Sequence, residues 1–266
     1  MRSDCHIHVR DDFDAKTVLA DMDRLGIDRI VTMGMSGKTL DEQRASNDAL
    51  AKQCAVAPKR LLGFARVDPR IEGITDEIKR CKQDLALPGI KMLPDHWAPC
   101  DDIMFPVYET IEAMGMPIIF HSGILWGNAD SSRFCRPALY ESVIHFPKLT
   151  IALAHIGWPW VDECIAVVNR FVSVARRQKR PVPQVLIDCT PGTPPIYRKP
   201  AFEKALACCK AENMIYGSDL GLPGSDMQHT RDRMDSDTAI LKELGCTDEE
   251  VDGILGRNLD RLLMDV

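Results

Sequence analysis

The sequence predicts an α/β fold in which eight parallel strands close into a (β/α)8 TIM barrel, and three observations lead to this prediction. Short apolar runs recur roughly every 33 residues, each is followed by a segment with helical spacing, and no linker-like stretch interrupts the series. The chain has 266 residues, a length at which such barrels commonly form one unit. We therefore expect a single barrel domain over residues 1–266, with an open, doubly wound sheet as the structural alternative.

The eight expected strands are short and almost continuously apolar. Such runs are typical of parallel strands whose two faces are both covered, whereas half-exposed strands alternate apolar and polar residues. Between the strands, apolar residues return at helical spacing, as at Ile165, Val168 and Val172. We expect the strands at residues 5–9, 29–34, 61–67, 89–93, 117–123, 149–157, 184–190 and 213–219.

The end of the chain and three longer connections complete the predicted barrel. Thr247 and Glu250 form a capping-box pattern before an apolar-periodic stretch that ends at Leu263, which predicts a closing helix. Longer segments follow the fifth, seventh and eighth expected strands, and we expect them to be loops over the mouth of the barrel, at 122–136, 190–200 and 220–236.

The composition restricts the classes of partner and the compartment. The net charge is −6, the pI is about 5.7, and Lys and Arg are scattered, which argues against nucleic acid or an anionic membrane as the main partner. The ten cysteines form no C-x-x-C pair, and neither a secretory leader nor an apolar stretch long enough to span a membrane is visible. We expect a cytoplasmic protein that acts on a small molecule, either alone or as a homo-oligomer.

Two histidines, His6 and His8, lie one residue apart in the first expected strand. Alternate residues of a strand point to the same face, so both imidazoles are expected side by side, with Cys5, Ile7 and Val9 on the other face. Two imidazoles on one face suit a metal ion. Taken alone, the pair also fits two histidines with ordinary hydrogen bonds.

Further polar residues stand where other expected strands end. In a TIM barrel the catalytic groups lie at the carboxyl ends of the strands, and Lys91, His121, His155 and Asp219 all occupy such positions. Each one alone could be a core histidine, a snorkelling lysine or a helix cap. Since an unpaired buried charge costs several kcal/mol, so many ionisable groups on one rim need a shared partner, and a divalent metal would supply it.

These residues form an ordered set of motifs that resembles a known superfamily. The set HIH (6–8), GIK (89–91), FHSG (120–123), AHIGWP (154–159) and YGSD (216–219) resembles the amidohydrolase superfamily. More narrowly, it is similar to the amidohydrolase-2 branch of TIM-barrel metal-dependent hydrolases and decarboxylases. The closing GRNLDRLL (256–263), with Asn258, is similar to the C-terminal helix of that branch, so the resemblance spans nearly the whole chain.

The resemblance implies a metal centre and two proton-transfer residues. Its ligands would be His6, His8, His121 and Asp219, with His155 as a further ligand or a catalytic acid or base. Zinc is the first expectation and manganese the second. We expect one ion rather than two, because a second ion would need Lys91 to be carboxylated. Asp219 would take the proton of a metal-activated water and pass it to the leaving group, and His155 would polarise a carbonyl or donate a proton.

The expected reaction is hydrolysis of an amide, ester or lactone of a small, carboxylated substrate. Relatives with the same residues also include non-oxidative decarboxylases of aromatic or enol acids, which is the alternative. A metal-retaining binding protein that has lost catalysis is the second alternative, although every implied ligand is present. The candidates for substrate contact are Arg10, His96, Trp126 and Trp158, because Arg pairs with carboxylates and aromatic residues stack on rings. Surface or loop-packing roles fit these four residues as well.

Two other motifs come close to known patterns but do not match them. GMSGKT (34–39) has two residues between its glycines, whereas a phosphate-binding loop requires four. GSDLG (217–221) has Asp219 where a nucleophile elbow requires serine. We therefore expect neither nucleotide binding nor serine-hydrolase chemistry.

Overall fold

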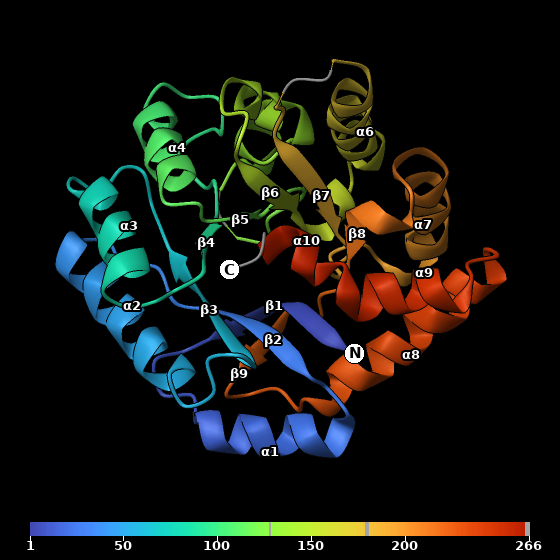
Figure 1. The fold of residues 1–266 in the computed structure, drawn as a ribbon, viewed down its shortest axis with the longest axis horizontal. Coiled ribbons are helices and arrows are strands. Elements are labelled where there is room, and N and C mark those ends of the chain that lie inside the picture. The colour runs from blue at the N-terminus through green and yellow to red at the C-terminus, as the bar shows by residue number, and fades with distance from the viewer. Residues whose placement is uncertain (128, 179–180, 264–266) are drawn as a thin grey trace.

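Parallel strands form one curled sheet around a central axis in the computed structural model, which describes residues 1–127, 129–178 and 181–263 (Figure 1). The strands follow one another around the sheet in the order β8-β7-β6-β5-β4-β3-β2-β1-β9. The predicted TIM-barrel architecture is therefore confirmed. The strands are β1 (Ser3–Val9), β2 (Arg29–Met33), β3 (Leu61–Arg66), β4 (Gly89–Met92), β5 (Ile118–Phe120), β6 (Thr150–Leu153), β7 (Gln184–Asp188), β8 (Met214–Ile215) and β9 (Leu220–Leu222).

The eighth expected strand, 213–219, is shorter than predicted, because β8 ends at Ile215 and is followed by a bend and then by a further short strand, β9. Asp219 in this bend has a φ of 60°, which a continuing strand cannot adopt. The bend still joins the two edges of the sheet, because Cys5 N donates to Tyr216 O at 2.9 Å and Asp219 N donates to His6 O at 2.9 Å. β9 then continues beside β1, where Leu220 pairs with Ile7. The prediction that 220–236 is entirely loop is therefore wrong.

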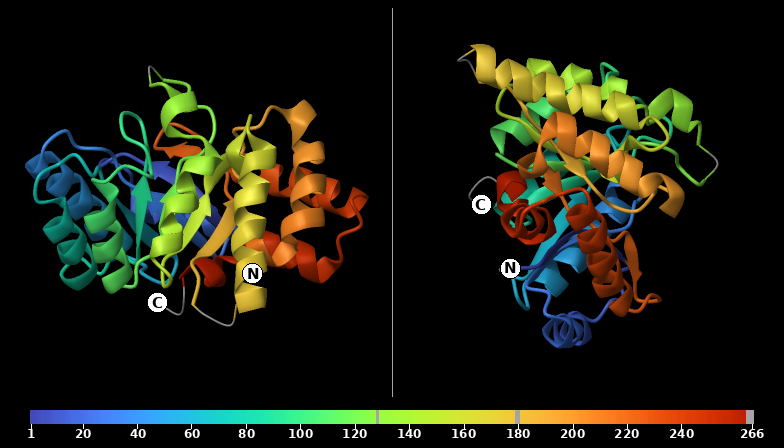
Figure 2. Two further views of the ribbon diagram at one scale, coloured as in Figure 1. Left: turned by 90° about the horizontal axis from the view of Figure 1, so that it is seen from above. Right: turned by 90° about the vertical axis from the view of Figure 1, so that its right-hand side faces the viewer.

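Helices surround the sheet on its outside, as both views in Figure 2 show. Local signals explain their ends: the Asp14 side chain accepts hydrogen bonds from the first turn of α1, and Gly26 ends that helix with a φ of 66°. None of the described helices is both long and apolar enough to cross a membrane. The helices are α1 (Ala15–Leu25), α2 (Leu40–Cys54), α3 (Ile74–Gln83), α4 (Met104–Ala113), α5 (Ser131–Phe134), α6 (Val161–Gln178), α7 (Pro195–Cys209), α8 (Gln228–Glu243), α9 (Asp248–Asp252) and α10 (Leu259–Leu263).

The three connections expected as loops contain more regular structure than predicted. Pro195 opens α7 inside the 190–200 segment, because the fixed φ of proline suits the first turn of a helix. Asp130 caps the short helix α5 inside 122–136 by accepting a hydrogen bond from Arg133 N. In 220–236, β9 is followed by α8. These connections therefore contain the short helix α5, the strand β9 and the first turns of the longer helices α7 and α8.

The sixth expected strand, 149–157, is also shorter than predicted. β6 ends at Leu153, and residues 154–157 form a 3-10 turn in which His155 and Ile156 have φ values of 61° and 51°. These left-handed values are uncommon for residues other than glycine and are incompatible with a strand. His155 therefore stands on a tight turn and not on a strand.

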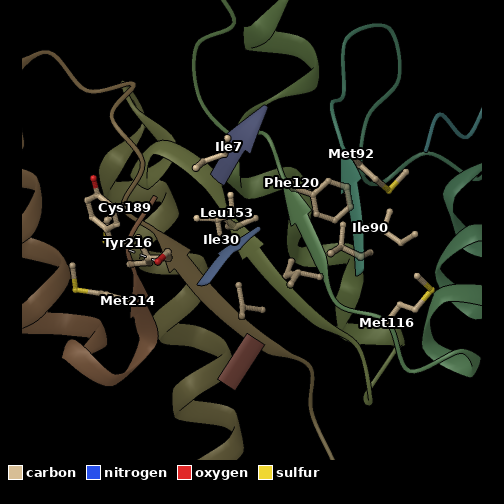
Figure 3. Packing of buried hydrophobic residues seen from close by; sticks show 14 of the residues in the cluster. Ile7, Ile30, Ile90, Met92, Met116, Phe120, Leu153, Cys189, Met214 and Tyr216 are labelled. Atoms are coloured by element: carbon tan, nitrogen blue, oxygen red, sulfur yellow. Dashed lines mark hydrogen bonds between the residues drawn. The ribbon is translucent and has the colours of Figure 1, made fainter. Parts of the chain in front are cut away.

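The core has two layers, one outside and one inside the barrel. The outer layer lies between the strands and the helices, and Figure 3 shows part of it, including Ile7, Ile30 and Leu153. The inner layer includes Val31 of β2 and, contrary to prediction, Cys5. Cys5 departs from the face of Ile7 because the pairing of β1 with β2 shifts register between Asp4 and Ile7.

Helix α10 closes the end of the barrel that is opposite to the mouth. Its Leu259, Leu262 and Leu263 belong to the inner layer, and α10 lies at the centre of the ring in Figure 1. Asn258, just before this helix, donates to Ala211 O at 2.7 Å and to Met214 O at 2.8 Å. The amide group of Asn258 thereby attaches α10 to the start of β8.

We expect Leu262→Ala to destabilise the protein by about 2–4 kcal/mol, because the side chain is fully buried inside the barrel and its removal leaves a cavity. Urea unfolding followed by circular dichroism measures the change. Val56→Ala is the control, since Val56 is 51% exposed and its truncation should change the free energy of unfolding little. Equal effects of the two substitutions would contradict the conclusion that α10 closes this end of the barrel and packs in its inner layer.

Candidate metal centre

Three segments far apart in the sequence bring His6, His155 and Asp219 together at the carboxyl ends of the strands. His6 lies on β1, His155 on the turn after β6, and Asp219 in the bend between β8 and β9. One ligand atom from each residue lies within 4.8 Å of the other two. The juxtaposition agrees with the expectation that polar groups from several strand ends meet at the mouth of the barrel.

His8 completes a tight set of donor atoms around the same point. Its Nε2 lies 3.2 Å from His6 Nε2 and 3.4 Å from Asp219 Oδ1, and His6 Nε2 lies 3.5 Å from Asp219 Oδ1. Ligands of a tetrahedral ion with bonds near 2.1 Å stand about 3.4 Å apart. Burial lowers the pKa of both His6 and His8, which favours the neutral imidazoles that bind metals. These residues therefore fit one divalent ion.

Asp188, at the end of β7, fixes the orientation of the His6 ring. Its Oδ2 lies 2.6 Å from His6 Nδ1, and its Oδ1 accepts hydrogen bonds from the backbone N and the hydroxyl of Thr190. A carboxylate can only accept, so Nδ1 carries the proton and Nε2 presents its lone pair to the centre. Sequence analysis missed Asp188, although it ends the seventh expected strand just as His121 and Asp219 end theirs.

We expect Asp188→Asn to weaken metal binding by about tenfold to a hundredfold, because His6 would lose the charged partner that holds its tautomer. Titration of the metal-free chain with Mn²⁺ or Zn²⁺ gives the Kd. Asp84→Asn is the matched control, since Asp84 is exposed at the end of α3. An unchanged Kd in Asp188→Asn would show that the contact does not support metal binding.

His155 is held in a strained position next to His6. Its ring centroid lies 5.5 Å from that of His6, and its Nδ1 is buried without a hydrogen-bond partner among the described residues. Gly192 allows this approach, because a Cβ there would come within 2.8–2.9 Å of atoms of the His155 side chain. Left-handed residues other than glycine cost energy and cluster at functional sites. Burial lowers the pKa of His155, which keeps the imidazole neutral.

His121 lies at the edge of this group. Its ring centroid is 4.9 Å from that of His155, and its backbone is fixed by bonds to Met92 O and from the Tyr140 hydroxyl. Within the described part of the chain, His121 Nε2 is buried and has no hydrogen-bond partner. Leaving such an atom unpaired costs about 1–3 kcal/mol, so an ion or a substrate atom would complete its bonding.

Lys91 is fully buried beside the donor atoms. Its Nζ lies 3.0 Å from His6 Nε2, and burial, assisted by the charge of Arg66, lowers its pKa to about 7. The Lys91 amine therefore occupies the lone pair of His6 Nε2 that an ion would also use. A carboxylated Lys91 that bridges two ions stays a prediction.

Asp219 is kept ionised by its neighbours. Burial acts to raise its pKa, but the contact with His8 and the proximity of His6 and His155 outweigh burial and hold the pKa well below the usual value. Its position depends on Asp4, whose Oδ1 accepts from His6 N and Ser218 N, both at 3.0 Å. Asp4 thus ties β1 to the bend that carries Asp219, a role that the sequence did not reveal.

The four predicted substrate contacts lie on loops at the mouth, in different environments. The Arg10 side chain is 59% exposed and bonds to Asp12 at 3.2 Å, and His96 lies 3.4 Å from Asp95. Trp126 is 79% exposed and stacks on Trp158 with ring centroids 6.3 Å apart. None of these contacts reaches the donor atoms, so the contacts of these four residues with a substrate stay predictions.

Solved structures with this fold include several decarboxylases. The chain is similar to 2,6-dihydroxybenzoate decarboxylase from Rhizobium, with 17% identity, a TM-score of 0.69 and all of both chains covered. It is similar to dihydroxybenzoic acid decarboxylase from Polaromonas sp. JS666, solved with manganese and 2-nitroresorcinol, with 16% identity, a TM-score of 0.70 and coverage of 99% of this chain and 97% of that one.

A third similar structure is 5-carboxyvanillate decarboxylase from Novosphingobium aromaticivorans DSM 12444, solved with manganese and 4-hydroxy-3-methoxy-5-nitrobenzoic acid. The identity is 15%, the TM-score is 0.69, and 99% of this chain and 96% of that one are covered. No curated protein matches the sequence. The family model described as Amidohydrolase matches residues 3–263. The chain therefore belongs to the amidohydrolase family, as its motifs predicted.

Proposed function

We propose that the protein is a metal-dependent, non-oxidative decarboxylase of a hydroxylated aromatic or enol acid. The observation that carries the proposal is the convergence of His6, His8, His155 and Asp219 on one point, with Lys91 beside them. Imidazole and carboxylate donors with a buried lysine suit an acidic, oxygen-rich substrate. The similar structures give further support, because all three described above are decarboxylases of hydroxylated aromatic acids.

One divalent ion would be held by His6, His8 and Asp219, with His155 and His121 able to complete its ligands. Two of the similar decarboxylases contain manganese, which supports manganese at least as well as the zinc that the sequence favoured. When bound, the ion would supply positive charge that orients the acidic oxygens of the substrate and stabilises negative charge building up on its ring.

Residues of the chain would take up and donate the proton that the reaction requires. In decarboxylation a proton is added to the ring carbon that bears the carboxylate, the bond between them breaks, its electron pair stays with the ring, and the carboxylate leaves as carbon dioxide. Asp219 is ionised and can take a proton from the substrate hydroxyl or from solvent. His155 lies within reach of Asp219 and would receive this proton from it and pass it to carbon, because the lowered pKa of His155 makes its protonated form a good donor.

Isotope labelling tests the proposal. The metal-loaded chain is incubated in D₂O with 2,6-dihydroxybenzoate and other hydroxylated aromatic acids, and carbon dioxide and products are measured. We expect release of carbon dioxide with one deuterium on the carbon that lost it. A metal-loaded protein that releases no carbon dioxide from this panel, yet opens lactones or cleaves amides, would overturn the proposal.

Hydrolysis is the second candidate, because the ionised Asp219 beside His8 is also suited to take a proton from water. In H₂¹⁸O, a hydrolase would place ¹⁸O in the carboxyl product of a lactone, ester or amide, whereas a decarboxylase would leave these compounds unchanged. A binding protein without catalysis is disfavoured, since each predicted ligand is present and four of the predicted site residues converge.

A further inference from the structure

Arg66 is a buried cation on the strand next to that of Lys91, close to the metal centre. It is the last residue of β3, pairs in register with Lys91 of β4, and is only 8% exposed. Among the described residues, no hydrogen bond or ion pair engages its guanidinium group; its backbone N alone donates, to Asn47 Oδ1 at 3.1 Å. Burial lowers its pKa to about 10, so the group is still charged at neutral pH.

The guanidinium borders a cavity of about 600 Å³ at the mouth of the barrel. The cavity lies between the segments that follow β2, β3 and β4. Two acidic residues line it, but both are engaged, because Arg70 contacts Asp68 at 2.6 Å and Asp95 at 3.0 Å. The charges of Asp95 and Asp68 also act on Arg66, but among the described residues neither makes a hydrogen bond or an ion pair with its guanidinium, so Arg66 is left without a direct anionic partner.

Arg66 is also close to the metal centre. It pairs in register with Lys91, whose Nζ lies 3.0 Å from His6 Nε2, and its charge contributes to lowering the pKa of His8 and that of Lys91. An unpaired buried cation is costly, and proteins tolerate that cost where a ligand supplies the counter-charge. A guanidinium group binds a carboxylate through two parallel hydrogen bonds, which a lysine cannot reproduce.

We infer that Arg66 and this cavity form a subsite for a second anionic group of the substrate, one that is retained in the reaction. The substrate class would then be an aromatic dicarboxylate, with one carboxylate lost at the metal centre and the other held by Arg66. This inference rests on the proposed decarboxylase function. It assigns to Arg66 the carboxylate recognition that the sequence attributed to Arg10.

Two ligands that differ by one carboxylate test the subsite. The first is 4-hydroxy-3-methoxy-5-nitrobenzoic acid, whose nitro group has the shape of the departing carboxylate, and the second is 2-methoxy-6-nitrophenol, the same ring without the acid. Calorimetry on the manganese-loaded protein gives both Kd values. We expect the acid to bind about tenfold to a hundredfold more tightly than the phenol. Arg66→Gln should abolish this preference and Arg66→Lys should retain part of it.

Lys38→Gln is the matched control, because Lys38 is an exposed cation that borders the same cavity, and its removal leaves Arg70 paired with Asp68 and Asp95. It should keep the preference for the acid. An Arg66→Gln variant that keeps the preference would overturn the inference. Since Arg66 is unpaired, Arg66→Gln should fold with a Tm at least equal to that of the wild type, whereas a large loss of Tm would assign Arg66 a structural role and overturn the inference.

A second measurement separates failure of the subsite from failure of the proposed function. Benzoate is added to the protein as purified, and the rise in Tm is compared among wild type, Arg66→Gln and Lys38→Gln. We expect a rise in the wild type and in Lys38→Gln that is lost in Arg66→Gln. This result would support the anion subsite even if no decarboxylation occurred, whereas equal rises in all three proteins, or none, would overturn it.

Discussion

Asp219→Asn is expected to lower the turnover number on the order of 10³-fold, because the amide cannot take up the proton that the carboxylate handles. The substitution removes the negative charge of the side chain while it keeps the size and shape of that side chain. Asp219 has a φ of 60°, and asparagine is among the residues that best tolerate this left-handed conformation, so the bend between β8 and β9 should survive. Steady-state kinetics on the metal-loaded variant, with metal content measured in parallel, checks the prediction.

The measured metal content distinguishes two explanations for a loss of activity in Asp219→Asn. If Asp219→Asn keeps the ion and loses turnover, the carboxylate acts on the proton; if it loses both, the carboxylate acts first as a ligand. Turnover equal to that of the wild type would contradict both roles. The exposed Asp84→Asn variant should match the wild type in both measurements.

His6→Ala is expected to remove nearly all bound metal and activity. Its Nε2 lies within 3.5 Å of the donor atoms of His8 and Asp219, and its Nδ1 contacts Asp188, whose buried carboxylate would keep only its hydrogen bonds from Thr190. Plasma emission spectrometry on protein purified without chelator should give about one ion per wild-type chain and less than about a tenth of that in the variant.

His145→Ala is the matched control, since His145 is exposed and lies just before β6, at the end of the barrel away from the mouth. It should bind metal as the wild type does. About two ions per wild-type chain would indicate that Lys91 is carboxylated and bridges them. A wild-type chain that takes up no ion on reconstitution would contradict the centre itself.

The part of the fold that can be predicted from the sequence is the repeated unit of a strand and a helix. Apolar runs separated by helical spacing were enough to predict the barrel, since each unit carries the same signal. The departures occur where single residues leave regular geometry. His155 was expected on a strand and stands on a left-handed turn, and the eighth strand is broken at Asp219. Tertiary contacts impose both conformations, and the local secondary-structure propensities of the sequence do not predict them.

The candidate site likewise contains residues that the sequence could predict and residues that only the folded structure identifies. The rule that polar residues gather at strand ends was enough to select His6, His155 and Asp219, which the fold brings together. Asp188 satisfies the same rule and could have been predicted. Arg66 was less visible, because its lack of a partner depends on Arg70 occupying the neighbouring acids, a fact that only the folded arrangement reveals.

The stacked indoles of Trp126 and Trp158 give the mouth of the barrel an optical label. Their rings are nearly parallel, at 19°, with centroids 6.3 Å apart, close enough for their electronic transitions to couple. They come from different connections, the one after β5 and the one after β6, so the coupling depends on how those two segments sit together. Near-ultraviolet circular dichroism would therefore follow any movement of the mouth when a ring-bearing ligand enters, without a dye or a coupled assay.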